Sequence, residues 1–286
     1  MIKTILVPAG GTDTDDAGFS AALAMARKFD AHIDVLHVRL DPVEAAVAMT
    51  ADSAAGTMIS GFIDRLEQDA AERAARAQKN FDAFCAREKM TVAASPEAAK
   101  GPTAEWHVET GQEPRWFVTY GQAADLVVAP RGAPDDPAPR SLLETVLLES
   151  GRPVLIPSPA APTAARADTV AIGWKPERQC VRAVAAAMPF LTRAKRVIVL
   201  CVEEEDGPPD EAERLVRNLA WQGISATIER LRPGDDGGAA LLTAAAAKAG
   251  LLVMGAYGHS RLREWVFGGF TQRALADASL PLLMVH

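Results

Sequence analysis

Residues 251–271 read LLVMGAYGHSRLREWVFGGFT, and this stretch decides the fold class. Its first four residues are apolar, which is typical of a short strand covered by helices on both faces of a parallel sheet. Gly255, Gly258 and Gly268 follow, and a helical segment from Phe270 to Ser279 comes next. In open α/β sheets a ligand binds beyond the carboxyl ends of the strands, where the first N–H groups of a helix suit a phosphate. The stretch therefore predicts an α/β fold with an anion-binding turn.

The strand–helix pattern occurs twice along the chain. Strand candidates at 4–7 and 33–38 flank an amphipathic stretch in the first half, and strand candidates at 169–172 and 197–202 flank another in the second. Ile5 and Val170 lie 165 positions apart, and the next strands are offset by 164. Because the register holds across two strands and the helix between them, the pattern indicates an internal repeat.

The end of each half also matches, but at a smaller offset. Gly132 and Gly258 lie 126 positions apart, and Pro153 and Pro281 lie 128 apart. The first half therefore carries nearly 40 more residues after its second strand. We expect them to form a helical insertion at about 42–90, a charged and alanine-rich stretch.

Strands that alternate with helices pair in parallel through right-handed crossovers. The sequence therefore predicts two doubly wound, mainly parallel-sheet α/β domains, 1–157 and 168–286, joined by a Pro/Ala linker. We expect the last strands of the two domains, at 153–157 and 281–286, to pair and form an intramolecular pseudo-dimer, which would seal two sheet edges. A homodimer of the whole chain is a further expectation.

Composition restricts the partners and the compartment. The chain has 286 residues, of which 49% are hydrophobic, and a formal net charge of −7, which disfavours nucleic acid as a partner. Its three cysteines lack the spacing of a metal site or a disulfide framework. The chain shows no signal-peptide pattern at its start and no apolar run long enough for a membrane span. We therefore expect a cytoplasmic protein.

The glycine spacing resembles the ATP-binding signature of universal stress proteins, G-x2-G-x9-G-[ST], and the order of strands and helices in each half is similar to that family's adenine nucleotide alpha hydrolase-like fold. The chain is thus identified as a tandem member of the family. The resemblance implies that the second domain binds ATP or another adenine nucleotide. The positions that it assigns to the ligand are Cys201 and Val202 at the adenine, Gly173 and Lys175 after the first strand, and Gly255, Gly258, His259, Gly268, Gly269, Phe270 and Thr271 around the phosphates.

Two positions depart from the family pattern. Lys175 stands where an acidic residue usually helps to hold the nucleoside, and an ammonium group cannot accept a hydrogen bond from a ribose hydroxyl. It can instead meet a phosphate or point to solvent. Gly269 replaces a common Ser or Thr, so one hydroxyl is lost while the backbone donor remains. The first half departs further, with Ala129 and Arg140 in place of two glycines, and we expect it to be empty.

Chemistry beyond binding has little support in the sequence. No paired carboxylates, nucleophile–base pair or metal-ligand motif stands out, so we expect no catalytic residues, no metal site and at most slow, incidental ATP hydrolysis. Asp13, Asp15 and Asp16 are interpreted as a solvated loop that caps a helix.

Two other functions were weighed. The first is a nucleotide-free dimeric interaction scaffold, which Lys175 and the degenerate first half favour. The second is a nucleotide-transferring enzyme such as an adenylyl transferase. It is disfavoured because Pro8–Thr12, after the first strand, is not a phosphate-loop motif.

Overall fold

The computed structural model describes residues 1–50, 59–95, 101–131, 137–158, 168–203, 211–232, 236–256 and 269–286. The chain divides into two compact units, Met1–Arg152 (unit 1) and Pro153–His286 (unit 2). The division precedes the predicted linker, because strand β6 (Val154–Ile156), which the sequence analysis assigned to the first domain, belongs to unit 2. There β6 pairs antiparallel with β11 (Leu282–Val285), the edge pairing expected from the sequence.

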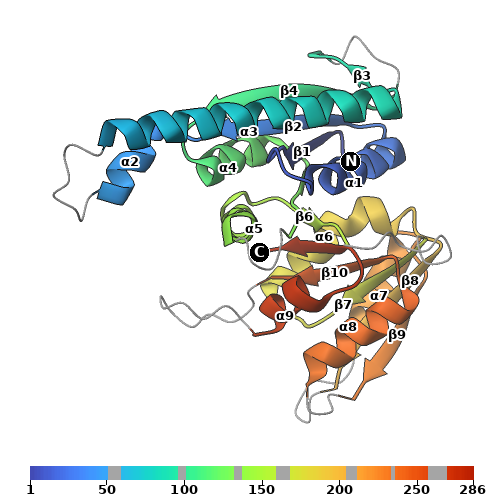
Figure 1. The fold of residues 1–286 in the computed structure, drawn as a ribbon. Coiled ribbons are helices and arrows are strands. Elements are labelled where there is room, and N and C mark those ends of the chain that lie inside the picture. Colours follow the sequence, from blue (N-terminus) through green and yellow to red (C-terminus); the bar gives the residue numbers. More distant parts are fainter. Residues whose placement is uncertain are drawn as a thin grey trace. The chain divides into compact units, whose positions relative to one another are not determined.

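Unit 1 is a parallel sheet covered by helices (Figure 1). Its elements are β1 (Thr4–Pro8), α1 (Asp15–Phe29), β2 (His32–Arg39), α2 (Pro42–Thr50), α3 (Ile59–Glu88), β3 (Thr91–Val92), β4 (Thr103–Thr110), α4 (Glu113–Ala123), β5 (Leu126–Val128) and α5 (Pro137–Glu149). The strands lie in the order β3-β4-β2-β1-β5, with every pairing parallel. Helix α1 contacts α3, and α4 contacts α5. This is expected if right-handed crossovers place one pair of helices on each face of the sheet.

Unit 2 repeats the same plan. Besides β6 and β11 it contains β7 (Thr169–Gly173), α6 (Arg178–Leu191), β8 (Arg196–Val202), α7 (Glu211–Trp221), β9 (Ala226–Leu231), α8 (Gly237–Lys248), β10 (Leu251–Gly255) and α9 (Gly269–Asp277). Its strand order is β6-β11-β10-β7-β8-β9, parallel except for β6. The predicted α/β class with mainly parallel sheets is confirmed.

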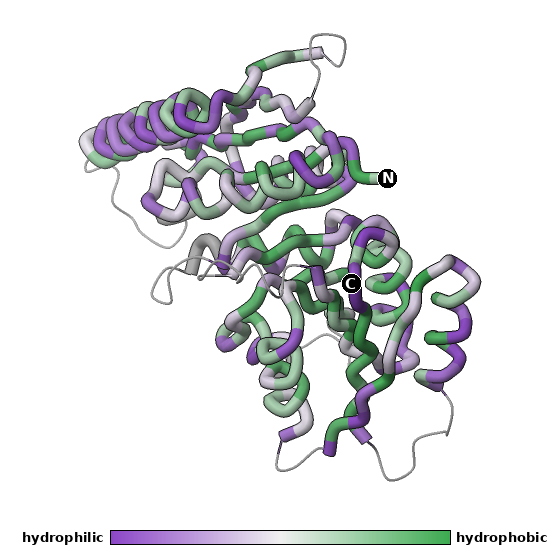
Figure 2. The backbone as a smooth tube through the Cα atoms, turned by 90° about the vertical axis from the view of Figure 1, so that its right-hand side faces the viewer, coloured by the Kyte–Doolittle hydropathy of each residue, from purple (hydrophilic) through white to green (hydrophobic). Residues whose placement is uncertain are grey.

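Hydrophobic residues are concentrated in the central strands of each unit, whereas the long helix α3 is mostly hydrophilic (Figure 2). Ile5, Leu126 and Leu252 have no exposed surface, as expected for strands with helices on both faces. Among the described residues no helix is both long enough and apolar enough to cross a membrane.

The predicted insertion in the first half consists of α2 and α3. Helix α3 has 30 residues, whereas α7, which follows the corresponding strand of unit 2, has 11. Phe81 and Phe84 of α3 pack edge-on against Phe19 of α1, with ring centroids 6.5 and 5.4 Å apart. These aromatic contacts fasten the inserted helix to the sheet.

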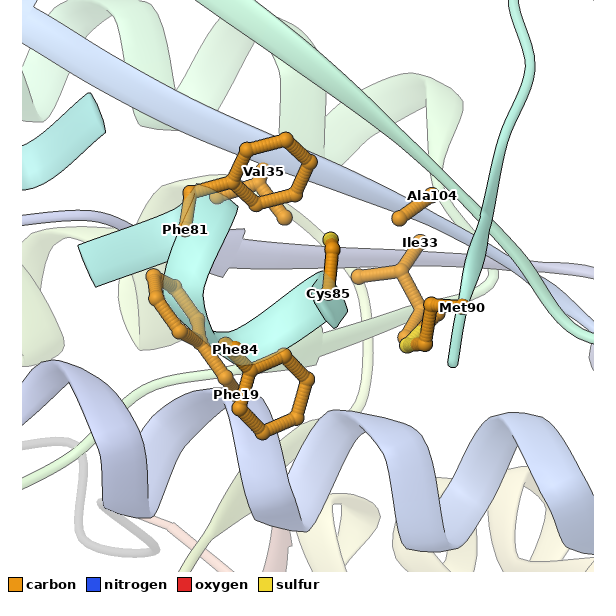
Figure 3. Close-up of a pocket in the computed structure, with 8 residues that line it drawn as sticks. All are labelled: Phe19, Ile33, Val35, Phe81, Phe84, Cys85, Met90 and Ala104. Atoms are coloured by element: carbon orange, nitrogen blue, oxygen red, sulfur yellow. The ribbon is translucent and has the colours of Figure 1, made fainter. Parts of the chain in front are cut away.

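A small apolar cavity lies beneath α3 (Figure 3). It is lined by Phe19, Ile33, Val35, Phe81, Phe84, Cys85, Met90 and Ala104. Burial and the charge of Asp82 raise the pKa of the Cys85 thiol to about 11. The cavity offers no charged lining group and its thiol is neutral, so it is a packing gap and not a polar ligand site.

The loop between β1 and α1 is held by a buried carboxylate. Asp15 is 4% exposed and accepts hydrogen bonds from the backbone N–H groups of Gly10 (2.8 Å) and Gly11 (2.9 Å) and from Asn80 Nδ2 (3.0 Å). The interpretation of this region as a solvated, capping loop is therefore wrong for Asp15, although Asp13 and Asp16 are exposed. Asp15 satisfies loop donors, which sequence could not reveal because Asn80 arrives from the distant α3.

Replacing Asp15 with alanine is expected to lower the free energy of unfolding by about 2–3 kcal/mol, because two buried N–H groups lose a charged acceptor. Denaturant titration of the full chain measures the change. Asp16→Ala is the matched control. Within the described part of the chain Asp16 makes an exposed ion pair with Arg87, so its loss should cost less than about 1 kcal/mol. Equal losses in the two variants would contradict this role of Asp15.

Candidate functional site

The predicted ligand residues of unit 2 that the structure describes gather at the carboxyl edge of the sheet. Gly173 ends β7 and Lys175 follows it, Cys201 and Val202 end β8, and Gly255 ends β10. β7 lies between β8 and β10. The strands that follow β7 in the sequence, β8 and β9, lie on one side of it, and β10 and β11 lie on the other. Such a switch point is where a doubly wound sheet opens a crevice.

The end of β8 extends beyond its neighbour β7. The β7–β8 register ends at Gly173 and Leu200, whereas the β8–β9 register continues to Val202 and Leu231. The Trp174 N–H donates to Leu200 O (2.9 Å), and the Glu203 N–H donates to Leu231 O (2.9 Å). Along a strand between two parallel neighbours, the N–H and C=O of successive residues face one neighbour and then the other. Leu200 faces β7, so the N–H and C=O of Val202, two residues later, also face the β7 side. They lie beyond Gly173, the last residue of β7 that pairs with β8. One backbone donor and one backbone acceptor therefore face the switch point at this edge.

Gly255 is required by packing. A Cβ atom there would lie 2.6 Å from Cys180 N and 2.7 Å from the carbonyl carbon of Gln179, so the end of β10 touches the first turn of α6. Burial raises the pKa of the Cys180 thiol even though backbone groups of Lys175 and Gly255 lie against it. Close packing against α6 therefore explains why the first position of the motif is glycine, whether or not a ligand binds.

Two side chains in the loop after β7, Glu177 and Trp174, are relevant to the replacement of the usual acidic residue by Lys175. Lys175 is ion-paired with Glu177, with Nζ 3.5 Å from Oε1, so a carboxylate is present in this loop although not at the expected position. The adjacent Trp174 has a buried Nε1–H without a hydrogen-bond partner among the described residues. A buried indole donor normally has a partner, so this N–H is available to an acceptor.

The neighbouring adenine position, Cys201, has no reactive character. Burial, the largest influence, raises the pKa of its thiol to about 11, although Arg230 beside it acts in the opposite direction. The thiol is therefore neutral at physiological pH, and any contribution of Cys201 to a ligand comes from its backbone or its apolar surface.

Helix α9 spans Gly269–Asp277, within two residues of the predicted 270–279 at either end, and Thr271 in its first turn is only 4% exposed. Its side chain is therefore packed inside the unit, which leaves backbone N–H groups as the donors that this turn can offer. Gly258, His259 and Gly268 lie outside the described residues, as does the side chain of Phe270.

Sequence reasoning missed an ion pair at this edge. Asp236 caps α8 by accepting from the N–H groups of Gly238 (2.9 Å) and Ala239 (3.1 Å), and it also pairs with Arg273 of α9. Together these contacts fix the start of α8 to the first turns of α9. The Asp-Gly-Gly sequence before a helical run is the sequence signal for the cap. The pairing with Arg273 has no such signal, because tertiary structure brings α9 next to α8.

Comparison with known proteins decides the family. The model of the universal stress protein family matches residues 1–156 and 192–286. The chain belongs to the universal stress protein family. No match was found among curated proteins.

Solved structures of similar fold cover almost the whole of this universal stress protein. One is a universal stress protein from Archaeoglobus fulgidus DSM 4304, with 14% sequence identity and a TM-score of 0.69; the alignment covers 99% of this chain and 97% of that one. Another is a Pseudomonas aeruginosa PAO1 protein of unknown function, with 14% identity and a TM-score of 0.56, covering 99% and 92%. At these identities the likeness establishes the fold alone.

The corresponding edge of unit 1 is occupied by its own side chains. His37, at the place where unit 2 has Cys201, is 1% exposed and stacks on Trp106, with ring centroids 6.1 Å apart. Arg73 of α3 donates from Nε to Gly10 O (2.7 Å). Gly11 has a φ of +70°, and a Cβ there would lie 2.5 Å from Arg73 O. The inserted helix thus lies directly against the β1–α1 loop.

A second group that sequence reasoning missed lies elsewhere in unit 1. His32, Asp34 and Glu105 bring ligand-type atoms within 4.8 Å of one another, with His107 beside them. The sequence analysis expected no metal-ligand motif, because these residues form no local motif. Their only sequence signal is the alternation His-x-Asp and Glu-x-His in two separate strands.

Gly255→Ala is expected to lower the free energy of unfolding by about 1–3 kcal/mol, because the added methyl group meets backbone atoms that cannot turn away. Thermal or denaturant unfolding measures the effect. Gly61→Ala is the control: that glycine lies in α3 with open space around its Cβ position, so alanine should leave stability unchanged or raise it slightly. A Gly255→Ala protein as stable as the parent would refute the close approach.

Proposed function

We propose that this universal stress protein is a tandem of two family domains, and that unit 2 binds one adenine nucleotide, ATP in the first place, as a stress-response regulator or protective protein. The observation that carries the proposal is that the N–H and C=O of Val202 face the β7 side beyond the last residue of β7 that pairs with β8. Adenine presents a donor, its amino group, beside an acceptor ring nitrogen. The N–H and C=O of one strand residue point to the same side and can meet both.

Three neighbouring features support this pose. Gly255 ends β10 at this edge without a side chain, and α9 begins at Gly269, directly after the third glycine of the motif, so its first N–H groups suit a phosphate. The unpartnered indole N–H of Trp174 is a donor adjacent to the same edge. Glu177, paired with Lys175, supplies the carboxylate that the loop otherwise lacks.

We infer that unit 1 has lost this role. Its loop N–H groups already donate to Asp15, and the buried His37, near the end of β2, stacks on Trp106 of β4. A nucleotide would have to displace buried, hydrogen-bonded groups, which carries a substantial free-energy cost. The chain would therefore bind one nucleotide and not two.

We propose no catalytic role for the nucleotide site. Cys201 and Cys180 carry thiols whose pKa values are raised, Cys201 to about 11, mainly by burial, so neither is an activated nucleophile. ATP turnover and pyrophosphate release are expected to stay at background. Cytoplasmic location and homodimer formation remain predictions from the sequence.

The test is calorimetric titration of the full chain with ATP, ADP and AMP. One site per chain is expected, with affinity reduced at least about tenfold in Gly258→Leu, because a bulky side chain would block the backbone approach to the phosphates. Gly132→Leu, at the matching position of the first half, is the control and should bind like the parent. No heat at millimolar nucleotide would reject the proposal.

That negative result would favour a nucleotide-free interaction scaffold, for which Lys175 in place of an acidic residue is the specific observation. Pulling down partners with the full chain would then be the next step. Stoichiometric pyrophosphate release from ATP would point to a nucleotide-transferring enzyme.

A further inference from the structure

Four polar side chains lie together on one face of the unit 1 sheet. Strands β2 and β4 pair in parallel with Asp34 opposite Glu105 and His32 opposite Thr103, and His107 lies two residues beyond Glu105. Since alternate residues of a strand point to the same face, His32 and Asp34 of β2 share a face with Glu105 and His107 of β4. This arrangement, the β2–β4 cluster, contrasts with the apolar strands at the centre of the sheet.

The spacing of the cluster matches the coordination sphere of a metal ion. His32 Nε2 lies 3.5 Å from Asp34 Oδ1 and 3.9 Å from Glu105 Oε2. His107 Nε2 lies 2.9 Å from Asp34 Oδ1 and 3.8 Å from Glu105 Oε2. Ligands at about 2.0–2.2 Å from a tetrahedral zinc ion stand about 3.3–3.6 Å apart. The four distances bracket that value. His32, Asp34 and Glu105 already place one ligand atom each within 4.8 Å of one another, and His107, now hydrogen-bonded to Asp34, would have to turn to join them.

Neighbouring residues orient the two imidazole rings. His32 Nδ1 is hydrogen-bonded to the hydroxyl of Thr103 (2.6 Å), a residue only 8% exposed, so its Nε2 is the atom that faces the carboxylates. The His107 ring lies 5.4 Å from the ring of Tyr120, whose hydroxyl donates to Glu109 (2.7 Å). Metal-binding histidines are commonly held in this way through their second nitrogen or their ring face.

The charge of the cluster also suits a cation. Within the described residues the only cationic partners in ion pairs with Asp34 and Glu105 are the two histidines, which are neutral in their metal-binding form. Burial raises the pKa of Asp34, but the hydrogen bonds from His32 and His107 outweigh it and lower the pKa overall. The ligand side chains are between 23% and 30% exposed, so an ion can reach them from solvent.

We propose that His32, Asp34, Glu105 and His107 form a binding site for a divalent transition-metal ion, with zinc as the ion that suits this donor set best. Two imidazole nitrogens with two carboxylates are typical zinc ligands, whereas magnesium and calcium prefer oxygen donors alone. The ion would join β2 to β4 and stabilise unit 1. The site uses none of the predicted nucleotide residues, so a test of zinc binding does not depend on whether the proposed function is correct.

The test starts from the full chain stripped of metal with a chelator and titrated calorimetrically with zinc chloride. One zinc ion per chain is expected, accompanied by a rise in melting temperature because only the folded state holds all four ligands. Cobalt(II) in place of zinc should give the intense visible absorption of a tetrahedral site, which an unspecific surface site would not.

His32→Gln, His107→Gln and Asp34→Asn should each weaken zinc binding at least tenfold. Thr103→Val should weaken it as well, by about tenfold or more, because the orientation of His32 would be lost. His286→Gln, which removes a histidine from unit 2, is the matched control and should bind like the parent. Circular dichroism of each metal-free variant verifies folding, and if one variant is unfolded the others decide.

The proposal is overturned if the stripped chain takes up no stoichiometric zinc at micromolar concentration. It is equally overturned if folded His32→Gln and His107→Gln proteins bind zinc like the parent, or if His286→Gln abolishes binding. In the first case the cluster is only a hydrogen-bonded group of histidines and carboxylates. In the other two the ion binds elsewhere.

Discussion

Parallel pairing of β7 with both β8 and β10 is the constraint on which the rest of unit 2 depends. It forces every connection between these strands to cross over through a helix, and so brings all the carboxyl ends to one edge. β7 lies between β8 and β10, so this edge is a topological switch point, the place where doubly wound sheets commonly bind ligands. Gly255 sits against α6 at the same point, so the glycine serves packing first and can serve a ligand in addition.

The two units share one topology but differ in the helix that follows the second strand. Both have the same core order of strands, yet unit 1 carries a 30-residue helix whose Arg73 and Asn80 hydrogen-bond to the β1–α1 loop region. In unit 2 the helix after the second strand has 11 residues. A longer helix in one copy thus changes which loop groups remain free, while the sheet stays the same.

Much of the fold was predictable because it is written in local patterns. The apolar runs at 169–172, 197–202 and 251–254 predicted strands that the structure contains as β7, β8 and β10. The change in repeat offset predicted an insertion, which the structure contains as α2 and α3. The boundary between the units was less accessible, since β6 is assigned by its antiparallel partner β11, more than a hundred residues later.

The sites were predictable only in part. Glycine spacing pointed to the carboxyl edge of the unit 2 sheet, where Gly255 ends β10, but the burial of Thr271 and the Lys175–Glu177 pair depend on packing. The β2–β4 cluster could not be foreseen, because its four residues meet only through the register of two strands that are separated by α2 and α3. For the same reason the hydrogen bond from Asn80 to Asp15 has no signal in the sequence around Asp15.

The central claim is that one of the two crevices accepts an adenine nucleotide and the other is closed by its own side chains. Native mass spectrometry of the gently purified chain, at rising ATP concentration, tests it most directly. The account predicts a mass increase of a single nucleotide per chain that saturates. Two nucleotides per chain, or none at saturating ATP, would contradict it.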